Sequence, residues 1–120
     1  MKKKILVIGA STKPERYSYL AMHKLVNHGY EVVAIGLKQG IVAGITIDTE
    51  LFPYENIHTV TLYVNAQAQK EYYDYIISLN PKRVIFNPGT ENPEFYLLLE
   101  KHLIFYEVAC TLVLLSTNQF

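Results

Sequence analysis

The stretch Ile5-Leu6-Val7-Ile8-Gly9-Ala10-Ser11-Thr12 decides the fold of this chain. Its first four residues form a continuous apolar run, which is typical of a central strand that is covered on both faces. The run ends at Gly9, and a helical pattern then begins near residues 16–18 and ends at His28. A buried strand that leads through a glycine turn into a helix indicates the first unit of a parallel α/β sheet.

Short apolar runs alternate with helical patterns along the rest of the chain. We expect strands at 31–35, 60–64, 83–86 and 104–108, helices at 66–79 and 92–102, and a short helical turn at 111–115. A short extended piece at 45–47 lies within a less regular stretch, 36–56. The order predicts one α/β domain, residues 1–120, with a Rossmann-like, doubly wound, parallel sheet of five strands. The first strand should lie near the middle of that sheet.

Composition and charge limit the class of protein. Half of the 120 residues are apolar, which is enough for one buried core. The formal net charge is zero, so we expect no nucleic-acid or membrane partner, because binding to phosphate backbones needs an excess of Lys and Arg. The Lys2-Lys3-Lys4 cluster is interpreted as a solvated lead-in to the first strand. The single cysteine, Cys110, cannot form an intrachain disulfide, and we expect a soluble cytoplasmic protein.

The loop after the first predicted strand is the strongest candidate for a ligand site. Ligands of open parallel sheets lie at the carboxyl ends of the strands. A glycine such as Gly9 lets the backbone approach a ligand, and the next helix directs free N–H groups at an anion. Ser11 and Thr12 add hydroxyl donors, and Arg16 can contact a phosphate through two hydrogen bonds. The alternative is an ordinary turn in which Ser11 or Ser18 caps the helix.

This loop differs from the standard dinucleotide-binding motif. The pattern G-x-G-x-x-G is absent, because Ser11 replaces the second glycine and Pro14 replaces the third. NAD sites also place an acid after the second strand, whereas this chain has Gly36-Leu37-Lys38. A lysine there suits an additional phosphate better than a ribose diol, the alternative being that Lys38 is simply solvated.

Loops after the other strands add polar groups to the same edge of the predicted sheet. Asn65 follows the third strand, where it either contacts an adenine or caps the next helix. Asn87-Pro88-Gly89 follows the fourth strand, either as part of the ligand crevice or as a turn. That turn would precede Asn92-Pro93, which has the residues of a capped helix start.

The residues do not form a recognisable catalytic group. Cys110 follows the fifth predicted strand, and a nucleophilic cysteine would need a base nearby. We expect none of the four histidines beside it, so Cys110 is interpreted as a buried structural residue. The histidines lack metal-ligand spacing, and no carboxylates are paired for acid–base chemistry. We therefore predict neither catalytic nor metal-binding residues.

Four stretches occur in order along nearly the whole chain: residues 8–18 (IGASTKPERYS), 28–32 (HGYEV), 88–94 (PGTENPE) and 109–113 (ACTLV). With these stretches the chain resembles the small CoA-binding-domain family, a Rossmann-like group related to the nucleotide domain of succinyl-CoA synthetase α subunits. The resemblance implies that residues 9–12 bind coenzyme A, with its phosphates near the following helix. In the synthetase relatives a lysine after the second strand contacts the cofactor, and Lys38 falls at that place.

One position departs from the family: Gly36-Leu37 stands where many members have an Asn-Pro pair. The synthetase's phosphorylated histidine lies on a domain that this chain lacks, so the resemblance implies no ligase activity. The candidate ligand-binding residues are Gly9, Ala10, Ser11, Thr12, Arg16, Tyr17, Ser18, Lys38, Asn65, Pro88 and Gly89.

Three hypotheses follow from these observations. The first is a protein that binds coenzyme A or acyl-CoA without catalytic machinery. The second is a small enzyme, either NAD(P)-linked or dependent on Cys110, in which a homodimer would complete the substrate site. The third is a regulatory protein with a vestigial nucleotide crevice, which would fit the loss of the Asn-Pro pair.

Overall fold

The structure is a computed structural model that describes residues 3–120, and it places the first strand at the centre of the sheet. Within these residues seven strands lie in the order β3 (Gly40–Val42), β4 (Ile45–Asp48), β2 (Glu31–Gly36), β1 (Lys4–Ala10), β5 (Thr59–Leu62), β6 (Arg83–Phe86) and β7 (Tyr106–Val108). All neighbouring strands are parallel except β3 and β4. Each residue of the run Ile5–Ile8 has no exposed surface, as expected for a strand covered on both faces.

The prediction of five strands was wrong, because β3 and β4 form an additional hairpin at one edge. Ala43 and Gly44 connect them, and both have positive φ angles, of 53° and 79°. That is the geometry of a two-residue hairpin turn. The extended piece expected at 45–47 belongs to β4, which pairs with β2 in parallel. Val42 and Ile47 are buried, and they attach the hairpin to the core around β1 and β2.

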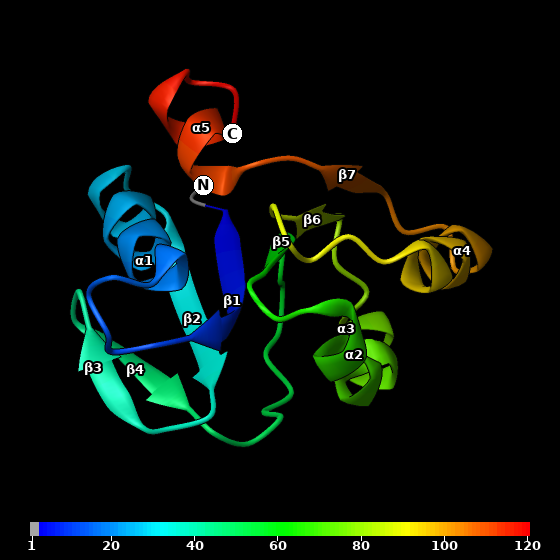
Figure 1. Cartoon of the computed structure of the whole chain (residues 1–120), viewed down its shortest axis with the longest axis horizontal. Coiled ribbons are helices and arrows are strands. Elements are labelled where there is room, and N and C mark those ends of the chain that lie inside the picture. Colours follow the sequence, from blue (N-terminus) through cyan, green and yellow to red (C-terminus); the bar gives the residue numbers. More distant parts are fainter. Residues whose placement is uncertain (1–2) are drawn as a thin grey trace.

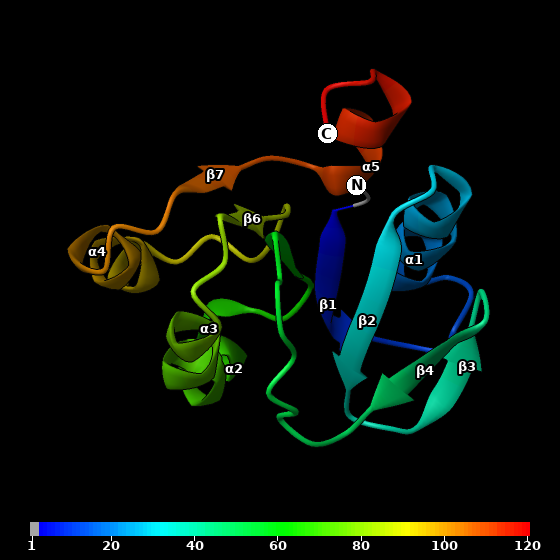
Figure 2. The same cartoon turned by 180° about the vertical axis from the view of Figure 1, so that it is seen from behind.

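Helices cover both faces of the sheet (Figures 1 and 2). They are α1 (Tyr17–Asn27), α2 (Ala66–Gln69), the 3-10 helix η1 (Lys70–Tyr72), α3 (Tyr73–Leu79), α4 (Pro93–Lys101) and α5 (Thr111–Ser116). Met22 and Leu115 place α1 and α5 on one face, with Ile5 and Val7. Ile76 and Phe95 place α3 and α4 on the other face, with Leu6 and Ile8. The alternation of side chains along β1 therefore divides the core into two layers.

The helix predicted at 66–79 is interrupted by η1. Gln69, at the end of α2, is fully buried, and its side-chain NH₂ group donates to the carbonyls of Val64 (2.9 Å) and Thr90 (2.7 Å). These bonds hold the short α2 against the loops after β5 and β6. Asn80 ends α3 in the left-handed conformation, with φ at 47°, at the Asn-Pro pair where the sequence predicted the end. Within residues 3–120, no helix is long and apolar enough to span a bilayer.

We predict that Gly36→Ala is far more destabilising than Gly29→Ala. A Cβ atom at Gly36 would lie 2.3 Å from the carbonyl oxygen of Ala10, and backbone cannot easily move away. This overpacking should lower the free energy of unfolding by about 3 kcal/mol. A Cβ atom at Gly29, which has a φ of +86°, would meet no other atom within 4 Å, so this variant should lose only about 1 kcal/mol.

Urea unfolding of both variants measures this difference. Equal losses would show that the β1–β2 contact relaxes to admit a methyl group.

Candidate functional site

A cleft of about 550 Å³ lies at the carboxyl ends of β1, β2, β5 and β6. All of the candidate residues named from the sequence line it, from Gly9 in the first loop to Gly89 after β6. Lys13, Leu37, Tyr63, Val64, Ala68 and Thr90 complete the lining. The topology therefore brings together loops that are far apart in the sequence, as the rule for open parallel sheets predicts.

Gly9 turns the chain from β1 into the first loop. Its φ is +93°, and the pairing of β1 with β2 shifts register between Ile8 and Ala10, so Gly9 forms a bulge. A Cβ atom there would lie 2.8 Å from the carbonyl oxygen of Tyr63. The glycine is thus required by close packing against the end of β5, and the bulge redirects residues 10–16 along the cleft.

Hydrogen bonds within the chain hold the first loop in place. The Ser11 hydroxyl accepts from the Lys13 N–H (3.1 Å), and the Arg16 N–H donates to the Lys13 carbonyl (3.0 Å). The side chain of Thr12 packs on Gly40, where a Cβ atom would lie 2.3 Å from its methyl group. The loop is therefore preorganised before any ligand arrives.

The N-terminus of α1 faces the cleft without a side-chain cap. Arg16 is the N-cap residue, its side chain makes no capping bond, and the first turn has no acid. The alternative in which Ser11 or Ser18 caps the helix is therefore not observed. Within residues 3–120 no acceptor takes the backbone N–H groups of Tyr17 and Ser18. Free N–H groups and the helix dipole make this corner favourable for an anion.

The charged side chains that line the cleft are all positive. Lys13, Arg16 and Lys38 are exposed along it, and no carboxylate is among its described lining residues. Glu91 lies beside the cleft and accepts the N–H of Gly89 at 2.9 Å, so that amide is already used. Among residues 3–120, no group of three or more His, Cys, Asp or Glu side chains is arranged to hold a metal ion.

Asn65 has a structural role and also lines the cleft. Its side-chain oxygen accepts from the Ala68 N–H at 2.9 Å and caps α2, as one of the two sequence interpretations expected. The Asn65 NH₂ group makes no hydrogen bond within residues 3–120 and remains exposed at the cleft.

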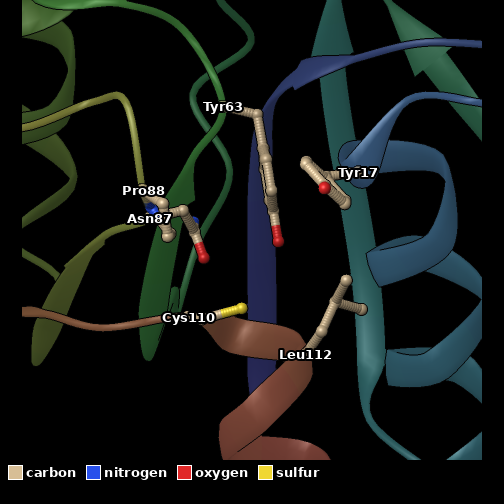
Figure 3. A pocket seen from close by; sticks show the side chains of 6 residues that line it. All are labelled: Tyr17, Tyr63, Asn87, Pro88, Cys110 and Leu112. Carbon is tan, nitrogen blue, oxygen red and sulfur yellow. The ribbon is translucent and has the colours of Figure 1, made fainter.

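A second, smaller pocket of about 210 Å³ adjoins the cleft. Tyr17, Tyr63, Asn87, Pro88, Cys110 and Leu112 line it (Figure 3). Tyr17, Tyr63 and Pro88 also line the cleft, so the two spaces share a wall. This pocket was not expected from the sequence, because Tyr63 was placed inside the strand predicted at 60–64, whereas β5 ends at Leu62.

Cys110 lines this pocket, and the expectation that it is buried was wrong. The side chain is half-buried, and its sulfur points into the space between Tyr63 and Leu112 (Figure 3). No His, Asp or Glu is among the described residues that line the pocket. Nucleophilic catalysis by a thiol requires a neighbouring base, and the described lining supplies none of these side chains for that role.

Tyr63 brings an unused donor to the pocket. Burial raises the pKa of its hydroxyl to about 12, although the nearby Thr61 and Thr111 hydroxyls oppose the shift. Those two hydroxyls hydrogen-bond to each other at 2.8 Å. The Tyr63 hydroxyl lies near both of them, but its oxygen is buried, and within residues 3–120 neither forms a well-aligned hydrogen bond with it. An unpaired buried hydroxyl is costly, so a ligand acceptor at this place would be favoured.

Asn87 forms the rear wall of the pocket and is fully engaged in the fold. Its side-chain NH₂ group donates to the Thr61 hydroxyl (2.7 Å) and the Leu62 carbonyl (2.9 Å). Its side-chain oxygen accepts the Thr111 N–H at 2.8 Å. Asn87 therefore joins β5, β6 and the start of α5, and it also lines the pocket.

Comparison with protein families gives a match over nearly the whole chain. The sequence model of the CoA-binding domain matches residues 3–116. The chain belongs to the CoA-binding domain family. The resemblance seen in the sequence is thereby confirmed, and every residue that lines the cleft lies within the matched part of this CoA-binding domain.

Solved structures share the fold of this chain. A crystal structure of an uncharacterized protein has a TM-score of 0.96 and 48% identity, with 100% of this chain and 99% of that chain covered. A hypothetical protein from Pyrococcus horikoshii OT3 has a TM-score of 0.82 and 31% identity, with 93% and 80% covered. A protein from Thermus thermophilus has a TM-score of 0.86 and 22% identity, with 99% and 91% covered, and shows the shared fold alone. No functionally curated protein matches the chain.

We predict that Asn87→Ala lowers the free energy of unfolding by about 3 kcal/mol. The change removes three buried hydrogen bonds and leaves the Thr111 N–H without its acceptor. Asn65→Ala is the matched control, since it removes one exposed helix cap and should cost about 1 kcal/mol. Chemical denaturation of both variants tests the ranking, and an Asn87 variant as stable as the control would contradict it.

Proposed function

We propose that this CoA-binding domain binds coenzyme A in the cleft at the N-terminus of α1. The observation that carries the proposal is the combination of an uncapped helix start with Lys13, Arg16 and Lys38, in a lining with no carboxylate among the described residues. Coenzyme A has three phosphate groups, so its binding requires a site that is favourable for anions. The family membership supports the same ligand.

The pyrophosphate is the part of the ligand that the first loop suits best. The backbone N–H groups of Tyr17 and Ser18 are free to donate, and the hydroxyl-bearing residues Ser11 and Thr12 line the same cleft. Arg16 is exposed at the same corner. A charge-assisted, bidentate contact from its guanidinium would add to the helix dipole.

Lys38 is the residue that we assign to the 3′-phosphate. It follows β2, lies on the cleft and is exposed. An acid at this place would bind a ribose diol, as in NAD sites, and this chain has no acid there. The 3′-phosphate distinguishes coenzyme A from NAD and from dephospho-CoA, so Lys38 would select the ligand.

The strand order then determines on which side of the cleft the adenine and the pantetheine arm of coenzyme A lie. β2 lies on one side of β1, whereas β5 and β6 lie on the other. With the 3′-phosphate at Lys38, the adenine lies on the β2 side, and the pantetheine arm extends toward Asn65, Pro88 and Gly89. The free Asn65 NH₂ group would then meet an amide carbonyl of pantetheine, rather than the adenine that one of the two sequence interpretations placed there.

Calorimetry with coenzyme A, dephospho-CoA and NAD tests the proposal. We expect coenzyme A to bind more tightly than dephospho-CoA, and NAD to bind most weakly. Lys38→Ala should weaken coenzyme A binding by about 1–3 kcal/mol but should leave dephospho-CoA unaffected. Arg16→Ala should weaken both CoA forms equally, because both contain the pyrophosphate.

Lys101→Ala is the control, since Lys101 is an exposed lysine at the end of α4 and is absent from the cleft lining. If none of the three nucleotides binds to the unaltered protein, the proposal fails and the hypothesis of a vestigial crevice is favoured. Unchanged affinity in both charge variants would place the phosphates elsewhere.

A further inference from the structure

We propose that the pocket beside Cys110 holds the acyl group of a short, uncharged acyl-CoA thioester. The inference rests on the proposed function, because the acyl group is attached to the end of coenzyme A. It goes further by naming the class of acyl group and the residues that select it.

Continuity with the cleft is the first observation. The pocket and the cleft share Tyr17, Tyr63 and Pro88, all on the side of β1 away from Lys38 or at the start of α1. A pantetheine arm that runs from the phosphates toward Pro88 therefore ends at the mouth of the pocket. The sulfur of the ligand would lie there, and the acyl group attached to the sulfur would enter the pocket.

The size of the pocket suits a short chain. Its volume is about 210 Å³, whereas an engineered apolar cavity of about 150 Å³ is large enough to bind benzene. The pocket therefore has room for an acyl group of roughly four to six carbons by the same comparison. A long fatty acyl chain would not fit within it.

The residues that line the pocket disfavour a charged acyl group. Leu112, Pro88 and the rings of Tyr17 and Tyr63 supply apolar surface (Figure 3). No cation is among the described lining residues, and Asn87 has its side-chain groups engaged in the fold. Burial of an unpaired carboxylate is strongly unfavourable. Acyl groups with a terminal carboxylate, such as succinyl, should therefore be rejected.

Tyr63 supplies the polar contact that an acyl thioester needs and free coenzyme A does not. Its hydroxyl is buried without a partner within residues 3–120, and in Figure 3 it is directed into the pocket between Tyr17 and Cys110. A tyrosine hydroxyl is protonated and can donate at neutral pH, and burial raises the pKa of this one further, to about 12. The hydroxyl oxygen is covered in this structure, so the carbonyl oxygen of the thioester would accept from it once the neighbouring side chains shift to admit the acyl group. Transfer of the acyl group to Cys110 is not proposed, since no base lines the pocket among the described residues.

Calorimetry with coenzyme A, acetyl-CoA, butyryl-CoA and succinyl-CoA tests the inference. We expect butyryl-CoA to bind about 15-fold more tightly than acetyl-CoA, since each buried methylene contributes roughly fourfold in affinity. Succinyl-CoA should bind no more tightly than coenzyme A.

Two variants distinguish binding of the acyl group in the pocket from binding of coenzyme A in the cleft. Leu112→Trp should fill the pocket, removing the advantage of butyryl-CoA while leaving coenzyme A affinity unchanged. Val113→Trp is the matched control, because Val113 is the next residue of α5, is 55% exposed and is absent from the pocket lining. Tyr63→Phe should weaken both neutral acyl-CoAs about fivefold relative to coenzyme A, as expected for one lost hydrogen bond.

The outcomes distinguish the two proposals. If coenzyme A binds but butyryl-CoA binds no more tightly than coenzyme A, the inference is overturned and the proposed function stands. If Leu112→Trp weakens coenzyme A and butyryl-CoA equally, the pocket holds pantetheine itself and the inference is again overturned. If coenzyme A does not bind at all, the proposed function fails, and the inference falls with it.

Discussion

Gly9 lies against the carbonyl group of Tyr63, so closely that a Cβ atom at Gly9 would come within 2.8 Å of the carbonyl oxygen. This contact has two effects. It allows the bulge that directs the first loop along the cleft, and it fixes the point at which the Tyr63 side chain leaves the end of β5. The same residue pair therefore determines where both the cleft and the smaller pocket lie, and most other features of the site depend on it.

Much of the sheet could be predicted because each buried strand is a local apolar run, and the first strand lies at the centre as expected. The β3–β4 hairpin could not, because its strands are three and four residues long. Its turn is Ala43-Gly44 rather than the stronger Asn-Gly or Asp-Gly signal. The 3-10 turn at 70–72 was missed for a different reason: it depends on the buried bonds of Gln69 to residues of two other loops.

The candidate site, like the fold, has one part that could be predicted from the sequence and one that could not. The cleft residues were predictable because a topological rule places strand ends together, whatever lies between them in the sequence. The smaller pocket was not predictable, since Tyr63, Cys110 and Leu112 come from separate segments and form no local pattern. Interpretation of Cys110 as buried failed because its exposure depends on how α5 packs on α1. Cytoplasmic location and a homodimer remain predictions from the sequence, as does the role of each cleft residue in binding.

The position of α5 couples distant parts of the chain. Its Leu112 closes the pocket, Leu115 packs into the core with α1, and Lys24 of α1 donates to Ser116. Among the described residues, the cleft is lined only by residues within 9–90, whereas the pocket is complete only when α5 is docked. A bound thioester that reaches Leu112 would hold α5 against the elements that form the cleft and would oppose fraying of α5.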